Sequence, residues 1–212
     1  MTDSPLLEQL LTESEIGDIY RVVRSSVYEE RIERSDFLKG KAALELEKKS
    51  PVNAMVLYLG ALYHLDFSGA QNLQFIPDHL FQVEDLQSKV LANLSLCYFL
   101  SGNFFLSRRS ADLALPLSKT AALSAKIRYR HALALNGLRD FDAAAISAQE
   151  ALTLLPGDAK VAELLREILI NRDEEQRKAD EMFRGKLKTS VPEVVVEEKK
   201  TICGCCRRRK TD

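Results

Sequence analysis

The sequence predicts an all-α fold in which three helix–turn–helix repeats stand side by side and a further helix follows them. Long stretches carry apolar residues at positions i, i+3, i+4 and i+7, which is the spacing of one helix face, whereas the alternating apolar runs of strands are few. Only 9 Gly and 6 Pro occur in 212 residues, so few positions break a helix. With 46% hydrophobic and 29% charged residues, the chain can bury one substantial helical core beneath a polar surface.

Residues 125–158 form the most complete of these repeats. Pro156 follows the second helix where that helix can no longer continue, and Asn136-Gly137 is expected to supply the turn between the two helices. Such a pair cannot bury its apolar face alone, so neighbouring repeats are expected. Small residues recur where the two antiparallel helices must approach closely, at Ala132, Ala144, Ala148 and Ala151.

Two earlier segments fit the same frame. Residues 88–121 carry Ser95 and Ser107 at the close-packing positions, with Ser101-Gly102-Asn103 as the turn. Residues 35–68 fit less closely, because Glu45 occupies a position that is usually aromatic. About 19 extra residues, roughly 69–87, separate these two repeats beyond the usual period near 34. Pro77 in this insertion marks a helix start, so the first helix of the second repeat is expected to be extended.

In these spacings the chain resembles tetratricopeptide repeat (TPR) proteins. Over residues 35–187 it resembles most closely the three-repeat domains of immunophilin-type co-chaperones. The resemblance implies a right-handed solenoid with repeats at 35–68, 88–121 and 125–158 and an extension helix over residues 159–187. It also implies a concave groove, lined by the first helix of each repeat, that holds the acidic C-terminal EEVD peptide of a heat-shock chaperone.

The same resemblance implies four residues that clamp the carboxylates of that peptide. They are Lys39, Asn93, Lys126 and Arg130, whereas the fifth clamp position, usually asparagine, is Ala43 here. Lys126 and Arg130 share one helix face, where two cations repel each other unless an anion lies between them. Arg130 can hold a carboxylate with two parallel hydrogen bonds, while each lysine supplies a point charge. Asn93 interrupts an apolar run, where a buried amide needs a partner.

These residues favour a protein-binding adaptor, co-chaperone-like, whose partner is a heat-shock chaperone peptide. An alternative stays open, in which the repeats form a scaffold for a different protein segment without chaperone binding. Taken singly, each lysine is an ordinary surface residue. No enzyme is expected, because His64, His79 and His131 belong to no recognisable nucleophile, metal or phosphate-binding motif and residues 1–34 are too few for a prolyl-isomerase domain. We predict no cofactor, and the net charge of −1 gives no case for a nucleic-acid partner.

The two ends of the chain differ from the repeats. Residues 1–34 carry apolar residues on one or two amphipathic helices that are expected to pack on the domain. Residues 159–187 continue as a helix with an apolar stripe that can cap the repeat array. Residues 188–212 lack helical periodicity and are expected to be a disordered tail. Cys97, within the second repeat, is expected to be a small core residue.

Cys203, Cys205 and Cys206 stand beside four basic residues in this tail. Acyl chains on these cysteines, together with the basic charge, would provide the two signals that stable anchoring to an anionic membrane surface needs. A flexible basic tail with incidental thiols is the alternative, and a metal site is less favoured because three thiols fall short of four zinc ligands. No apolar run is long enough for a transmembrane helix and the start lacks a secretory signal, so the expected location is cytoplasmic, with membrane association through an acylated tail.

Overall fold

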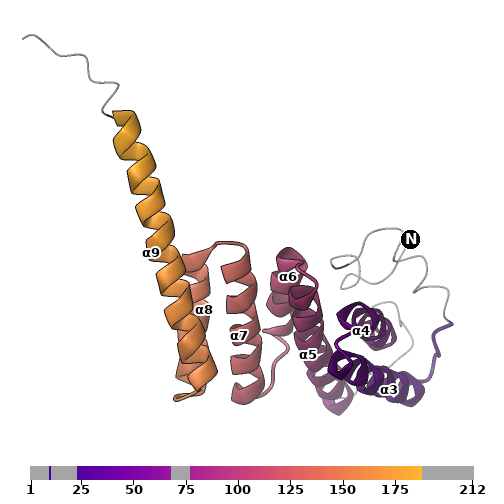
Figure 1. Cartoon of the computed structure of the whole chain (residues 1–212). Coiled ribbons are helices and arrows are strands. Elements are labelled where there is room, and N and C mark those ends of the chain that lie inside the picture. Colours follow the sequence, from indigo (N-terminus) through magenta and orange to yellow (C-terminus); the bar gives the residue numbers. More distant parts are fainter. Residues whose placement is uncertain (1–9, 11–22, 68–76, 188–212) are drawn as a thin grey trace, which may run out of the picture. The chain divides into compact units, whose positions relative to one another are not determined.

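The computed structural model describes Leu10, residues 23–67 and residues 77–187, and every regular element within these residues is a helix. This confirms the all-α fold. Three consecutive helix pairs stand side by side in chain order (Figure 1). The helices are α3 (Tyr28–Glu47), α4 (Pro51–Leu65), α5 (Pro77–Leu100), α6 (Phe104–Ala114), α7 (Ala121–Gly137), α8 (Phe141–Leu154) and α9 (Ala159–Leu187).

The helix pairs begin earlier than the repeats expected from the sequence. The first pair spans 28–65 rather than 35–68, so residues 28–34 belong to α3 and not to a separate N-terminal segment. The second pair begins at Pro77 and α5 is long, at 24 residues against 17 for α7. The third pair begins at Ala121, because the side chain of Thr120 caps the helix by accepting a hydrogen bond from the Leu123 amide. Residue spacing locates a repeat, whereas capping decides its first turn.

The turns inside the three pairs share one geometry. Lys49, Gly102 and Arg139 have positive φ angles of 59°, 77° and 64°, just beyond the end of a helix. In each turn the next residue donates its backbone N–H to a carbonyl five residues earlier, at 2.9 to 3.0 Å. This pattern is the Schellman motif, which satisfies carbonyls at a helix end.

Asn136-Gly137 is not a turn, contrary to expectation. Both residues complete α7, and the chain reverses over residues 138–140. Gly137 lies against the ring of Phe104 in α6, where an added Cβ would come within 2.6 Å of a ring carbon. The glycine therefore permits a close approach between neighbouring repeats.

Small residues at the expected close-packing positions are buried, as the sequence predicted. In the third pair Ala132, Ala144, Ala148 and Ala151 are all fully buried. In the second pair serines take this place: the hydroxyls of Ser95 and Ser107 lie 3.2 Å apart, and Ser107 donates to the Ser95 carbonyl at 2.8 Å. These bonds satisfy hydroxyls that would otherwise be costly to bury.

Two arginines hold the C-terminal end of α4. Arg31 donates to the carbonyls of His64, at 2.8 Å, and Asp66, and its guanidinium lies 3.7 Å from the centre of the Phe67 ring. Arg24 donates to the carbonyls of Tyr63 and Asp66. Cations at this end of a helix also complement its partial negative charge. The result is a buried histidine, His64, surrounded by positive charge.

Both ends of the repeat array make contacts with the core. Leu10 is 1% exposed, and its carbonyl accepts a 3.1 Å hydrogen bond from the hydroxyl of Tyr98. At the other end the apolar residues Val161, Leu164 and Ile168 of α9 are buried in a core shared with α7 and α8. The helix has the bounds of the expected extension, 159–187. Contacts divide the chain into Met1–Glu174 and Glu175–Asp212, so only the first part of α9 belongs to the repeat unit.

Some predictions concern residues that the structure does not describe. Most of residues 1–22 and the tail 188–212, with Cys203, Cys205 and Cys206, lie outside the described residues. Within the described part, no helix is long and apolar enough to cross a membrane. Cys97 is fully buried with a free thiol, and burial raises its pKa to about 12, as fits an inert core residue.

Candidate functional site

The first helix of each pair supplies the residues implied by the resemblance. Lys39 and Ala43 lie on α3, Asn93 on α5, and Lys126 and Arg130 on α7. Helix α5 contacts both α3 and α7, so it stands between them. The three helices are therefore neighbours, and every residue of the expected clamp lies on one of them.

Arg130 and Asn93 are in direct contact. Arg130 is 7% exposed, and its Nη1 donates to the Asn93 Oδ1 at 3.0 Å and to the backbone carbonyl of Ala92. One bond therefore joins α7 to α5 across two repeats. It also fixes the amide of Asn93 with its oxygen toward Arg130.

The Arg130 guanidinium has no carboxylate partner within the described residues, although it is almost fully buried. Burial lowers its pKa to about 10, while neighbouring Tyr58, Cys97 and Tyr129 act in the opposite direction. The group therefore stays charged at neutral pH. Removing a cation from water without a countercharge is costly, and two neutral acceptors offset only part of that cost. A carboxylate at this position would gain a strong, charge-assisted hydrogen bond.

Lys126 adds a second positive charge one helical turn before Arg130. It is exposed and makes no ion pair with the described residues. Burial of part of the side chain, and then repulsion from Arg130, lower the pKa of Lys126. An anion bound between the two cations would relieve that repulsion.

Lys39 has a different environment. Its Nζ lies 2.5 Å from the carboxylate of Asp36 one turn earlier on α3, and it makes no hydrogen bond to the other three residues in the described structure. It lines an open hollow of about 660 Å³ between α3 and α5, together with the acidic residues Glu33, Asp36 and Asp85. The positive charge of Lys39 is thus largely compensated. Together with Ala43, this leaves the α3 part of the expected clamp weaker for anions than the α7 part.

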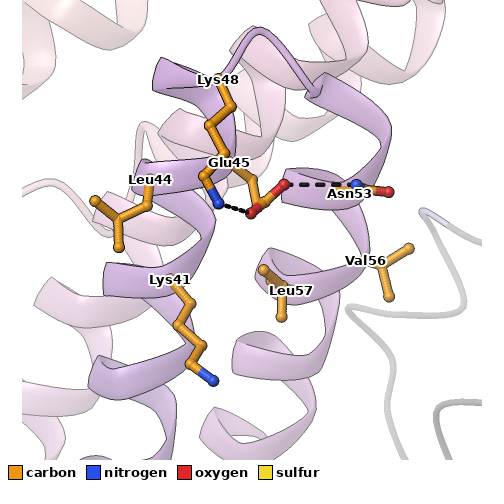
Figure 2. A pocket seen from close by; sticks show the side chains of 7 residues that line it. All are labelled: Lys41, Leu44, Glu45, Lys48, Asn53, Val56 and Leu57. Atoms are coloured by element: carbon orange, nitrogen blue, oxygen red, sulfur yellow. Dashed lines mark hydrogen bonds and ion pairs between the residues drawn. The ribbon is translucent and has the colours of Figure 1, made fainter.

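A second open hollow, of about 580 Å³, lies on α3 and α4 (Figure 2). Its central carboxylate, Glu45, already accepts hydrogen bonds from Lys48 at 2.8 Å and Asn53 at 3.5 Å. These bonds lower the pKa of Glu45. Glu45, Lys48 and Asn53 therefore bond to one another, whereas Lys41 in the same hollow has no acidic partner among the described residues.

His131 connects three helices. Its Nδ1 lies 2.8 Å from the Ser147 hydroxyl on α8, and its Nε2 lies 3.0 Å from the Asp112 carboxylate on α6. The order Ser–His–Asp is that of hydrolytic triads, which are recognised by geometry and not by sequence position. Here, however, Ser147 is 5% exposed and lies within a helix, where neighbouring backbone amides are engaged and cannot stabilise an oxyanion. The contacts instead join the second repeat to the third.

Sequence reasoning missed two residues next to those of the expected clamp, Asp36 and Tyr58. Asp36 stands three residues before Lys39, and that spacing on a helix does signal an ion pair. Tyr58 on α4 gave no such signal, because its place beneath Asn93 and Arg130 depends on how the repeats stack. Burial raises the pKa of Tyr58 to about 12, so it stays a neutral phenol.

Among solved structures, the chain is similar to the C-terminal TPR-containing domain of an FK506-binding protein from Plasmodium falciparum. The likeness covers 76% of this chain and 99% of that domain, at 19% sequence identity and a TM-score of 0.63. No protein-family model matches the sequence. No curated protein matches it either. The structural likeness shows the fold, a tetratricopeptide helical-repeat solenoid.

Proposed function

We propose that the chain is a co-chaperone-like adaptor whose groove holds the acidic C-terminal peptide of a heat-shock chaperone. The observation that carries the proposal is the buried Arg130 cation, which lacks a carboxylate partner among the described residues and stands one turn from the unpaired Lys126. Asn93 orients Arg130 through the 3.0 Å hydrogen bond. A peptide carboxylate would supply the missing negative charge.

The α7 side of the groove carries most of the proposed binding. Lys126 is exposed and free to meet a carboxylate, and Arg130 keeps donors on Nε and Nη2 beyond the two bonds of Nη1. Lys39 contributes less, because Asp36 competes with the peptide for its ammonium group. Recognition therefore depends on one strongly held carboxylate near α7 and α5.

Calorimetric titration with a free-acid peptide ending in EEVD tests this proposal. Lys126→Ala is expected to weaken binding at least about tenfold, since a hydrogen bond to a charged group contributes roughly 1.5–3 kcal/mol. Lys48→Ala is the matched control, because it removes the same charge from the hollow of Figure 2 and leaves the groove intact. Equal losses of affinity in both variants, or no loss in either, would overturn the proposal that the peptide binds in the groove.

A specific observation also favours the second candidate, a scaffold for a partner other than a chaperone. Ala43 offers no hydrogen bond at the position where the resembled family has asparagine, and the Lys39–Asp36 pair weakens the neighbouring cation. A groove in which only the α7 residues Lys126 and Arg130 are available to bind an anion can select an internal acidic segment instead of a chain terminus. Tight binding of an internal acidic peptide, with weak binding of the EEVD peptide, would favour this scaffold.

We further propose that the tail anchors the adaptor to a membrane through acyl chains on Cys203, Cys205 and Cys206. Support comes from the sequence, in which these thiols stand beside Arg207, Arg208, Arg209 and Lys210. Replacing the three cysteines by serine keeps the basic charge and removes the acceptors. Loss of the protein from the membrane fraction is expected, and unchanged membrane association would exclude acylation as its cause.

A further inference from the structure

The first and third helix pairs differ in how well their apolar residues are covered. On the third pair, α9 buries one of its faces against α7 and α8. On the first pair, α5 is the one helix among α3 to α8 that contacts α3 and α4. The side chains of Leu44, Val52 and Val56 on this pair are 54%, 58% and 58% exposed. An apolar surface that a further helix could cover is therefore left open here.

The exposed face of α3 alternates apolar and basic residues. Phe37, Lys41, Leu44 and Lys48 stand at positions i, i+4, i+7 and i+11, so they share one face of the helix. The Nζ of Lys41 lies 4.6 Å from the centre of the Phe37 ring, and Lys41 has no acidic partner among the described residues. This face thus combines apolar contact area with a free positive charge.

The hollow of Figure 2 lies between this face of α3 and helix α4, from which Val56 and Leu57 line it. Glu45, in the same hollow, already accepts a hydrogen bond from Lys48 at 2.8 Å. The charge that remains available to an occupant is that of Lys41. An acidic occupant is therefore favoured.

The backbone of α3 and α4 decides what shape of occupant fits. Their N–H and C=O groups bond within the helices, so along this face they offer no partners to an extended strand. A helix satisfies its own backbone and presents apolar side chains at i, i+3 and i+7. Val161, Leu164 and Ile168 of α9 pack on the third pair with that same spacing.

Two other occupants fit this face less well. A twofold pairing of two copies would place the lysines of one copy against those of the other, because a twofold interface sets the same patch against itself. A lipid bilayer presents no ridge that could enter a hollow, whereas Leu57 is half-buried in the wall of this one.

We propose that the exposed face of α3 and α4 is a second docking site, which takes an acidic amphipathic helix of a partner protein. The apolar side of that helix packs on Leu44, Val52 and Val56, and one of its carboxylates meets Lys41. The face contains none of the four residues of the proposed clamp. The protein would therefore hold two partners at once, one in the groove and one on this face.

Calorimetry with the full chain and three synthetic peptides tests the docking site. The first peptide is about 18 residues long, long enough for several helical turns, with leucine along one helical face and glutamate and alanine elsewhere. The second has lysine in place of glutamate, and the third spreads the leucines of the first around the helix. All three are amidated, so none carries a terminal carboxylate. The first peptide is expected to bind at least about tenfold more tightly than the other two.

Variants of the chain locate the bound peptide. Val56→Asp is expected to weaken binding of the first peptide at least about tenfold, because it removes apolar contact and repels glutamate. Ile146→Asp is the matched control on α8, since Ile146 is 59% exposed and Val56 is 58% exposed. It is expected to leave the affinity unchanged. Lys41→Glu should weaken binding of the first peptide and strengthen binding of the second.

The opposite results overturn the docking site. They are no binding of the first peptide, equal binding of all three peptides, or equal affinities of Val56→Asp and Ile146→Asp. A wild-type dimer in sedimentation that Val56→Asp dissociates would assign the face to a second copy instead. Binding to phosphatidylserine vesicles that Val56→Asp abolishes would assign it to a membrane.

The free-acid EEVD peptide separates this site from the proposed function. Val56→Asp is expected to bind that peptide as the wild type does, because Val56 lies outside the proposed clamp. Failure of the docking site would then leave the groove proposal standing, and failure of the groove proposal would leave the docking site standing. Loss of EEVD binding in Val56→Asp would overturn the separation of the two sites.

Discussion

The guanidinium of Arg130 donates a 3.0 Å hydrogen bond to the amide oxygen of Asn93, and this bond joins the third repeat to the second. The two residues are 37 positions apart in the chain. An amide and a cation are each costly to bury alone, and this hydrogen bond gives each of them a partner. It also leaves the charge of Arg130 without a carboxylate partner among the described residues, and this charge is the physical basis of the anion binding that we propose.

Asn93→Asp is expected to stabilise the protein and to abolish binding of acidic peptides. The new carboxylate would occupy the position of the present amide oxygen and supply the missing countercharge, contributing about 1–3 kcal/mol. Urea unfolding and calorimetry measure the two effects. The control Asn103→Asp keeps the cap of α6, because an aspartate can still accept from the Leu106 amide. Lower stability together with intact binding in Asn93→Asp would contradict the role of Arg130.

Gly137→Ala is expected to destabilise the protein by about 1–3 kcal/mol, because its Cβ would lie 2.6 Å from a ring carbon of Phe104. Gly40→Ala is the matched change on α3, where no atom lies within 4 Å of the added Cβ. There the alanine should stabilise by about 0.5–1 kcal/mol through its higher helix propensity. Equal effects at both positions would show that the Phe104 contact is unimportant.

Stability is expected to fall as the pH drops from about 6.5 to about 4. Burial, and then the positive charges of Arg34, Arg31 and Arg24, lower the pKa of His64 to about 4. In the unfolded chain the histidine takes up a proton near pH 6.5, so the unfolded state binds more protons over this range and gains stability as the pH falls. The loss is at most about 3 kcal/mol. Urea titrations at a series of pH values measure the free energy of unfolding of the wild type and of His64→Gln, and the two values should converge at low pH. Parallel dependences on pH would show that His64 does not cause the loss of stability.

The sequence predicts the fold better than the site. The same packing of two helices recurs in every repeat and leaves a regular pattern of small residues, whereas each pairing of polar side chains occurs once and leaves no such pattern. The buried small residues of the third helix pair could be identified from the sequence, because every helix pair of this kind needs small residues at the same spacing. They are Ala132, Ala144, Ala148 and Ala151. Gly137 was misplaced, since a glycine near a helix end fits a turn and a close contact equally well, and only the position of Phe104 decides between them.

The groove illustrates the same difference. Lys126 and Arg130 could be placed on one face from their spacing alone. The bond between Arg130 and Asn93 and the partial burial of Lys126 needed the stacking of repeats. The burial of Val161 against α7 and α8 depends on the docking of α9, and the spacing within α7 or α8 does not predict it.

The most direct measurement compares the affinities of a free-acid EEVD peptide and its C-terminally amidated form for the wild-type chain. Only the terminal carboxylate differs, so the comparison isolates the group that Lys126 and Arg130 are proposed to hold. Amidation is expected to weaken binding at least tenfold, since it replaces a charge-assisted hydrogen bond worth roughly 1.5–3 kcal/mol. Equal affinities for the two peptides would contradict the carboxylate clamp.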